Sequence, residues 1–98
     1  MINGGYVMDK TRKTRTEDGK LNLVGEQIAE LRQKKKMSQN ALARELQLLG
    51  VNLNKNAVSN IEIGKRSVSD IELFALATVL HVSADDFFRY VKERFANH

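Results

Sequence analysis

The segment 55–60, Lys-Asn-Ala-Val-Ser-Asn, holds the side chains of this sequence that are best suited to reading a nucleic acid. An Asn amide can pair bidentately with N6 and N7 of adenine in the major groove, and a Lys ammonium can donate to O6 and N7 of guanine. Gln, Lys and Arg donors on either side of such a segment can bind phosphates and fix its register. The same composition also describes an ordinary polar helix face, so both interpretations stay open on this segment alone.

No group of residues in the sequence suggests catalysis or metal binding. The chain has no cysteine, and its two histidines, His81 and His98, have no carboxylate pair or further histidine at ligand spacing. His81 is expected to be a turn residue or a cation at the end of a helix. The sequence therefore predicts that the protein is not an enzyme, and it indicates no catalytic residue, metal, cofactor or small-molecule ligand.

The polar segment is expected to lie on a short helix, residues 55–63. Only Val58 and Ile61 are expected to be buried, so they should anchor the helix to the core while its short polar side chains face outward. Gly64 can adopt the left-handed conformation that ends a helix, and Lys65 and Arg66 follow directly. Two anchors and an amide-rich outer face are what a helix inserted into the major groove requires.

Four helix starts are marked by the same local pattern. Ser38, Asn54, Ser69 and Ser83 are good N-cap residues, and each has an apolar residue directly before it and another four positions after it. Ser69 with Glu72, and Ser83 with Asp86, also form candidate capping boxes. Asn52 is a second candidate cap for the third helix. The pattern predicts an all-α domain of five helices, near residues 23–36, 39–49, 55–63, 70–80 and 84–96.

The last two helices carry most of the large apolar side chains. Helix 70–80 is apolar nearly all round, so we expect it to be the central helix, buried by the others. In helix 84–96 Phe87 should enter the core, whereas Phe88, Val91 and Phe95 recur along one side. A domain of this size has little room for both sets, so the second set suggests a homodimer interface. The alternative is that all of them complete the core.

Charge is unevenly distributed over the 98 residues. The net charge is +4, with 13 Lys and Arg against seven Asp and Glu in residues 1–66, and three against five in residues 67–98. Residues 1–20 look like a flexible basic tail, and residues 21–98 like the folded domain. The cluster Lys10, Arg12, Lys13 and Arg15 could lie along phosphates or have no role. No signal peptide or membrane-spanning stretch is present, which favours a cytoplasmic protein.

Four segments together resemble the XRE family of helix-turn-helix domains, which has the lambda-repressor-like fold. They are residues 25–32 (GEQIAELR), 37–43 (MSQNALA), 56–66 (NAVSNIEIGKR) and 73–80 (LFALATVL). The resemblance implies a sequence-specific binder of double-stranded DNA, expected to be a transcriptional repressor that acts as a homodimer. By that likeness Gln39 would contact a phosphate, Lys55, Asn56 and Asn60 would face base edges with Ser59 at their margin, and Lys65 and Arg66 would contact the DNA backbone. Glu62 resembles the structural Glu at the end of the family's recognition helix.

The chain departs from the family between its second and third helices. Gln39 and Ala43 fit the family pattern, but Gln47 stands where a glycine is usual, and about five residues are extra. We expect a longer second helix and a longer connection. Two other functions remain open: an antitoxin, or a protein-interaction module of the same fold that uses the Phe-rich last helix.

Overall fold

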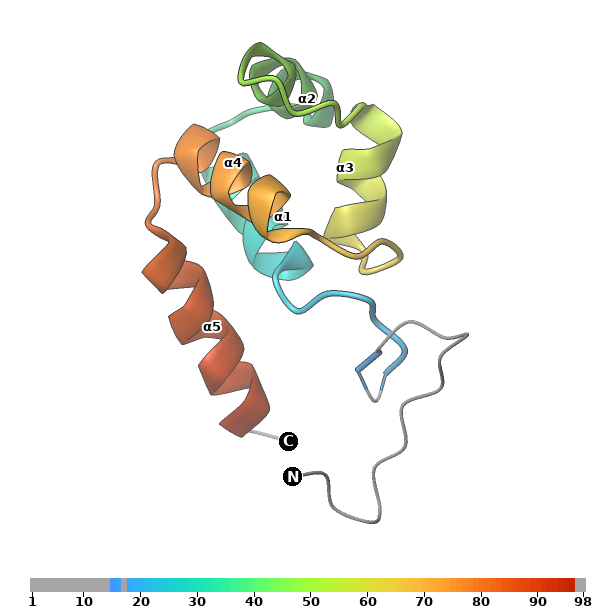
Figure 1. Cartoon of the computed structure of the whole chain (residues 1–98), viewed down its shortest axis with the longest axis vertical. Helices are drawn as coiled ribbons and strands as arrows, with labels where there is room; N and C mark the ends of the chain where they lie inside the picture. The colour runs from blue at the N-terminus through green and yellow to red at the C-terminus, as the bar shows by residue number, and fades with distance from the viewer. Residues whose placement is uncertain (1–14, 17, 97–98) are drawn as a thin grey trace.

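Five helices make up most of the chain in the computed structural model, which describes residues 15, 16 and 18–96, with the backbone alone for 94–96 (Figure 1). No strand occurs in these residues. The helices are α1 (Gly25–Lys34), α2 (Gln39–Leu48), α3 (Lys55–Glu62), α4 (Asp70–Leu80) and α5 (Ala84–Ala96). Each lies within about two residues of its predicted bounds, which is the usual uncertainty of a helix end. The predicted all-α fold is confirmed. Most of the basic cluster of the predicted tail, Lys10 to Lys13, lies outside the described residues.

The predicted N-caps are confirmed. The Ser38 hydroxyl accepts from the Ala41 N–H at 2.9 Å, and the Asn54 carbonyl oxygen accepts from the Ala57 N–H at 2.8 Å, so Asn54 and not Asn52 begins α3. The two capping boxes, at Ser69 and at Ser83, both form in the reciprocal manner expected. Because each cap satisfies amide groups that have no partner inside the helix, these short motifs fix where the helices start.

The core is built by every helix. The buried apolar side chains are Val24, Ile28, Leu42, Ala43, Leu46, Leu53, Val58, Ile61, Ala75, Leu76, Ala77, Leu80 and Phe87. The residues before the caps, Met37, Leu53, Val68 and Val82, all belong to this core or pack against it. The two anchors predicted for the third helix, Val58 and Ile61, are fully buried, and Phe87 enters the core as expected.

The expectation that helix 70–80 is buried all round is wrong. Ala75, Leu76, Ala77 and Leu80 of α4 are buried, but Ile71 and Phe74 are 71% and 70% exposed. The reason is geometric: α4 packs against α1, α2 and α5, and these neighbours leave one side of it uncovered. An even distribution of apolar residues around a helix therefore does not mark it as central in a domain with so few elements.

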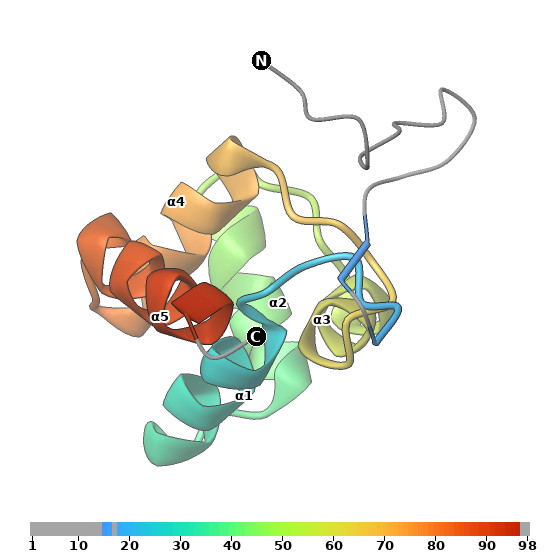
Figure 2. The ribbon, with the colours of Figure 1, turned by 90° about the horizontal axis from the view of Figure 1, so that it is seen from below.

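The connection from α2 to α3 spans residues 49–54. At its start Gly50 has φ 84°, its N–H donates to the Gln47 carbonyl at 2.9 Å, and the Val51 N–H donates to the Leu46 carbonyl at 3.0 Å. These two bonds form a Schellman motif, which ends α2. Leu53 is buried and fixes the other end of the connection. In Figures 1 and 2 the helices α3 and α5 lie on opposite sides of the molecule.

Candidate nucleic-acid interface

The outer face of α3 carries the residues predicted to contact bases. Lys55, Asn56 and Asn60 are exposed and Ser59 is half-buried, while Val58 and Ile61 on the opposite face are fully buried. The polar side chains are thus brought together on the solvent side of a helix that is held by its two anchors. Burial of the two Asn residues would have excluded base readout, and the structure places both in solvent.

Ile63 continues this outer face and was not singled out from the sequence. It is 49% exposed and lies seven residues after Asn56 and three after Asn60, so the three side chains share one stripe. An exposed Ile at this place can contact the methyl group of thymine, which is an apolar feature of the major groove. Its spacing from Asn56 and Asn60 is the signal that could have revealed it.

The turn after α3 fixes the backbone next to Lys65. Gly64 has φ 80°, its N–H donates to the Ile61 carbonyl at 3.1 Å, and the Lys65 N–H donates to the Asn60 carbonyl at 2.8 Å. This is the same terminating motif that ends α2. Lys65 is therefore held directly beyond the end of α3, with its side chain exposed.

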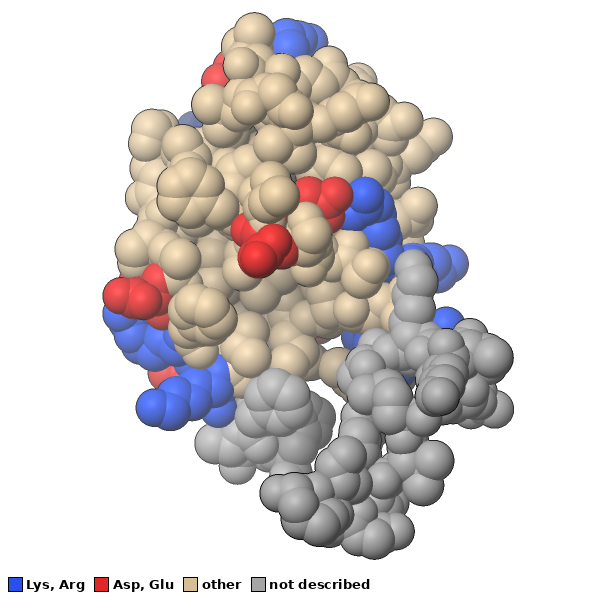
Figure 3. Space-filling view, in the orientation of Figure 1, with Lys and Arg blue, Asp and Glu red and all other residues tan. Residues whose placement is uncertain are grey.

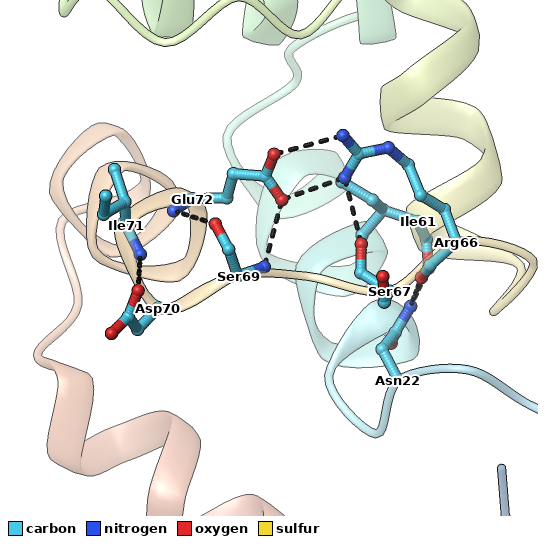
Figure 4. Close-up of polar contacts among 8 residues, drawn as sticks. All are labelled: Asn22, Ile61, Arg66, Ser67, Ser69, Asp70, Ile71 and Glu72. Atoms are coloured by element: carbon cyan, nitrogen blue, oxygen red, sulfur yellow. Dashed lines mark hydrogen bonds and ion pairs between the residues drawn. The ribbon is translucent and has the colours of Figure 1, made fainter. Parts of the chain in front are cut away.

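Arg66, predicted to contact the DNA backbone, is engaged with α4 (Figure 4). Its Nη1 donates to Oε1 of Glu72 at 2.9 Å and its Nη2 to Oε2 at 3.1 Å, and Nη1 also donates to the Ser67 carbonyl at 2.9 Å. The hydrogen bonds from Arg66, with the Ser69 amide, hold the pKa of Glu72 below its ordinary value. Since Glu72 also completes the capping box of Ser69, this ion pair ties the turn after α3 to the start of α4.

Gln39, predicted to contact a phosphate, lies at the start of α2 and reaches the end of α3. Its Nε2 donates to Oε1 of Glu62 at 2.9 Å, and Glu62, only 9% exposed, also accepts from Nε and Nη2 of Arg32 at 2.6 and 3.0 Å. Arg32 in turn donates to the Met37 carbonyl at 2.8 Å, and its pKa is raised by the hydrogen bond to Glu62. Glu62 is thus structural, as the resemblance implied, and joins α1, α2 and α3.

Asn22 is a further residue of this region that the sequence did not reveal. Its Oδ1 accepts from the N–H groups of Val24 and Gly25 at 3.0 and 2.7 Å, and its Nδ2 donates to the carbonyls of Ile61 and Arg66 at 3.0 and 2.8 Å. Figure 4 shows the second pair of bonds. The side-chain amide of Asn22 therefore provides hydrogen-bond partners for backbone N–H groups at the start of α1 and for backbone carbonyls at and just after the end of α3. Both carbonyl partners lie about 40 residues along the chain, so no local pattern could have shown them.

The charge distribution agrees with an anionic partner on the α3 side. In Figure 3 Lys and Arg atoms gather at the end of α3 and on the turn that follows it, and a second group lies on the lower part of α5. Among the described residues no group of three or more His, Cys, Asp or Glu side chains could hold a metal ion, and no described helix is long and apolar enough to cross a membrane.

A short helix with outward amides, braced by two preceding helices and followed by a basic turn, is the arrangement of a helix-turn-helix DNA-binding domain. The model of the HTH_3 family, described as helix-turn-helix, matches residues 28–87, well over half of the chain. The protein therefore belongs to this XRE-type helix-turn-helix family, and the resemblance noted in the sequence is confirmed. Its class is that of DNA-binding transcription regulators. No curated protein matches the chain.

Proposed function

We propose that the chain is a sequence-specific repressor that inserts α3 into the major groove of double-stranded DNA, with residues 21–98 as the DNA-binding domain. One observation carries this proposal: Lys55, Asn56 and Asn60 are exposed together on a helix whose opposite face is fixed by buried anchors. A rigidly held helix presents its donors in one orientation, which base-specific pairing requires. Repression needs only that the bound protein occupy its site, which a single domain of this kind supplies.

The residues divide into those that read bases and those that position the helix. Lys55, Asn56 and Asn60 contact base edges, Ser59 contributes at their margin, and Ile63 adds an apolar contact. The backbone contacts come from Gln39, Lys65 and Arg66.

Lys65 provides the most direct of the backbone contacts. The amide nitrogen of Gln39 already serves Glu62, and two nitrogens of Arg66 already serve Glu72. A phosphate contact by either side chain must share or replace these bonds, whereas the exposed Lys65 ammonium can bind a phosphate as a point charge.

The protein acts as a homodimer through the surface of α5 and the adjoining α4. The interface predicted from the sequence consists of Phe88, Val91 and Phe95. Phe88 is 63% exposed, Val91 packs partly on the core, and the side chain of Phe95 is outside the described residues. The exposed Ile71 and Phe74 of α4 enlarge the apolar surface beyond the predicted strip. A two-fold dimer would place its half-sites about 34 Å apart, one turn of DNA.

The second candidate function is an antitoxin or a protein-interaction module that uses the same apolar surface for a different protein. The exposed Ile71, Phe74 and Phe88 favour it, because apolar side chains of this size are seldom left in solvent together. The salt dependence of binding affinity distinguishes the two functions. Affinity for DNA falls steeply with salt, by a slope of about −0.9 per phosphate contact, whereas affinity for an apolar protein surface changes little.

The proposal is tested by selecting bound sites from a pool of random duplex DNA with the purified full-length protein. We expect a recurrent motif with two related halves, recovered equally by Arg44→Ala, which removes an exposed cation of α2 that the proposal assigns to no contact. A pool that stays random after repeated selection, at a salt concentration where the protein still binds DNA, would contradict sequence-specific binding.

A further inference from the structure

Residues 20–22, here called the N-terminal strap, run along the end of α3. The Leu21 N–H donates to the Gly64 carbonyl at 2.8 Å, Nδ2 of Asn22 donates to the Ile61 carbonyl at 3.0 Å, and Nζ of Lys20 lies 3.5 Å from the Ile63 carbonyl. Three consecutive residues thus satisfy carbonyl groups that the end of α3 leaves without helical partners. Figures 1 and 2 both show this part of the chain beside the end of α3.

The strap approaches α3 closely enough to depend on a glycine. Gly64 is buried, and a Cβ atom placed on it would collide with the side-chain stem of Lys20. The Lys20 stem therefore lies flat on the turn after α3, next to Lys65. Its position follows from packing and backbone hydrogen bonds and does not require an acidic partner.

A turn before the strap brings a second cation to the same place. The Thr16 N–H donates to the Lys20 carbonyl at 2.8 Å and the Gly19 N–H to the Thr16 carbonyl at 2.9 Å, so the chain folds back on itself. Nη1 of Arg15 donates to the Gly19 carbonyl at 3.2 Å, and the Arg15 side chain is exposed. Arg15 and Lys20 are held near one another at the end of α3 that also carries Lys65.

We propose that the strap builds a second DNA-backbone contact surface, in which Arg15 and Lys20 join Lys65 to bind the phosphates beside the base pairs read by α3. This inference rests on the proposed function and names a further part of the same interface. Because the strap and the turn before it are held beside α3, Arg15 and Lys20 stay close to the DNA once α3 is bound.

The proposed contacts are sequence-independent, and that property makes them measurable. Each phosphate contact that is lost makes the salt dependence of binding shallower by about 0.9 in slope, for any sequence. Loss of a base contact instead lowers affinity for the preferred site and changes which sequence is preferred. Arg15 and Lys20 must therefore alter the slope without altering the preference.

The test compares Arg15→Gln/Lys20→Met with the matched control Arg44→Gln/Lys34→Met in the full chain. Met keeps the apolar stem that packs on Gly64, and the control removes the same charge from exposed positions on α1 and α2. Dissociation constants are measured for the selected site and for a scrambled duplex between about 50 and 200 mM salt. We expect the slope of the first variant to be shallower by about 1 to 2, with an unchanged affinity ratio between the two duplexes, and no change for the control.

Equal slopes for wild type and Arg15→Gln/Lys20→Met would overturn the inference while leaving base readout by α3 intact. A loss of sequence preference in that variant would overturn it too, since the strap would then be acting on α3 itself. A wild-type protein without any preferred motif would contradict the proposed function, and this inference with it.

Discussion

Side chains of similar chemistry have different roles in this domain, and their role depends on what they already bind. Asn56 and Asn60 lie exposed on α3, whereas Asn22 uses its amide to join the start of α1 to the end of α3. Lys65 is exposed, whereas Arg66 is bound to Glu72. The side chains left in solvent are therefore the ones that we propose to contact DNA, and the bonded ones hold α3 in place.

This division predicts different outcomes for two neighbouring cations. Lys65→Ala should weaken binding to all sequences alike. It should also make the salt dependence of binding shallower by about 0.9 in slope, the value of one phosphate contact. Arg66→Ala should change that slope less and lower the free energy of unfolding, because it breaks the link to Glu72 and leaves a half-buried carboxylate. Salt-dependent binding and urea unfolding of both variants provide the measurement. A larger change of slope for Arg66→Ala than for Lys65→Ala would mean that Arg66 exchanges Glu72 for a phosphate.

At the scale of the elements, the domain depends on how closely α1 approaches α3. A Cβ atom on Gly25, the first residue of α1, would overlap the Ile61 carbonyl and lie 3.0 Å from the Glu62 carbonyl oxygen. Backbone atoms at this distance cannot move aside without shifting α3 itself. The close approach of the two helices thus fixes the orientation of the reading face.

Gly25→Ala is expected to destabilise the protein by about 1–3 kcal/mol, as overpacking commonly does. In a helix without this contact the same change would stabilise by about 0.5–1 kcal/mol, so the sign of the effect is decisive. Urea unfolding measures it, with Gln33→Ala at an exposed site of α1 as the control for helix propensity. An unchanged or raised free energy of unfolding would show that α1 and α3 do not meet as described.

The Arg66–Glu72 pair also predicts a pH dependence of stability. Because the pKa of Glu72 is lowered in the folded state, its contribution is present above its ordinary pKa of about 4.5 and is lost as the pH falls through the lower folded value. Glu72→Gln should therefore be less stable than wild type at pH 7, by up to about 1 kcal/mol, and this difference should shrink as the pH falls below 4.5. The pKa of Asp86 is also lowered, mainly by hydrogen bonds from Ser83. Its effect on the pH dependence of stability is the same in wild type and in Glu72→Gln, so it cancels in the comparison. Urea midpoints of both proteins, measured from pH 7 down to below pH 4.5, test this; a difference that stays the same over that range would contradict it.

The helices could be predicted from the sequence because the motifs that mark their starts are local. The caps at Ser38, Asn54 and Ser69 act within three residues, and all three were predicted from short motifs. The bonds of Asn22 to the end of α3, and the exposure of Ile71 and Phe74, depend on which elements meet in space. A sequence pattern states that a side chain is apolar or polar, but only packing decides which side of α4 remains uncovered.

At the scale of the whole molecule, α3 and the helix α5 that carries Phe88 lie on different sides. The helix α3 is on one side in both Figure 1 and Figure 2, and α5 is on the other. Two copies joined through α5 would therefore leave both α3 helices available for DNA. This separation of surfaces is what a dimer on a two-fold site requires.

Phe88→Glu is expected to prevent dimerisation with little effect on folding, because Phe88 is largely exposed. Sedimentation of protein–DNA complexes should give two copies of wild type on a site with two half-sites, and one copy of the variant on each half independently. The control Arg44→Glu places the same negative charge on an exposed residue of α2, outside the proposed interface. Two cooperatively bound copies of Phe88→Glu would contradict an interface at this surface.

The central claim is that the exposed side chains of α3 read bases, and the most direct measurement is the change in preferred sequence when one of them is removed. Sites are selected from random duplex DNA with wild type, Lys55→Ala and Asn60→Ala. Each variant should lose about 1–3 kcal/mol on the wild-type site and lose its preference at one or two base pairs, with the rest of the motif unchanged. If the three proteins, and Asn56→Ala with them, select the same motif, α3 is not the reading helix.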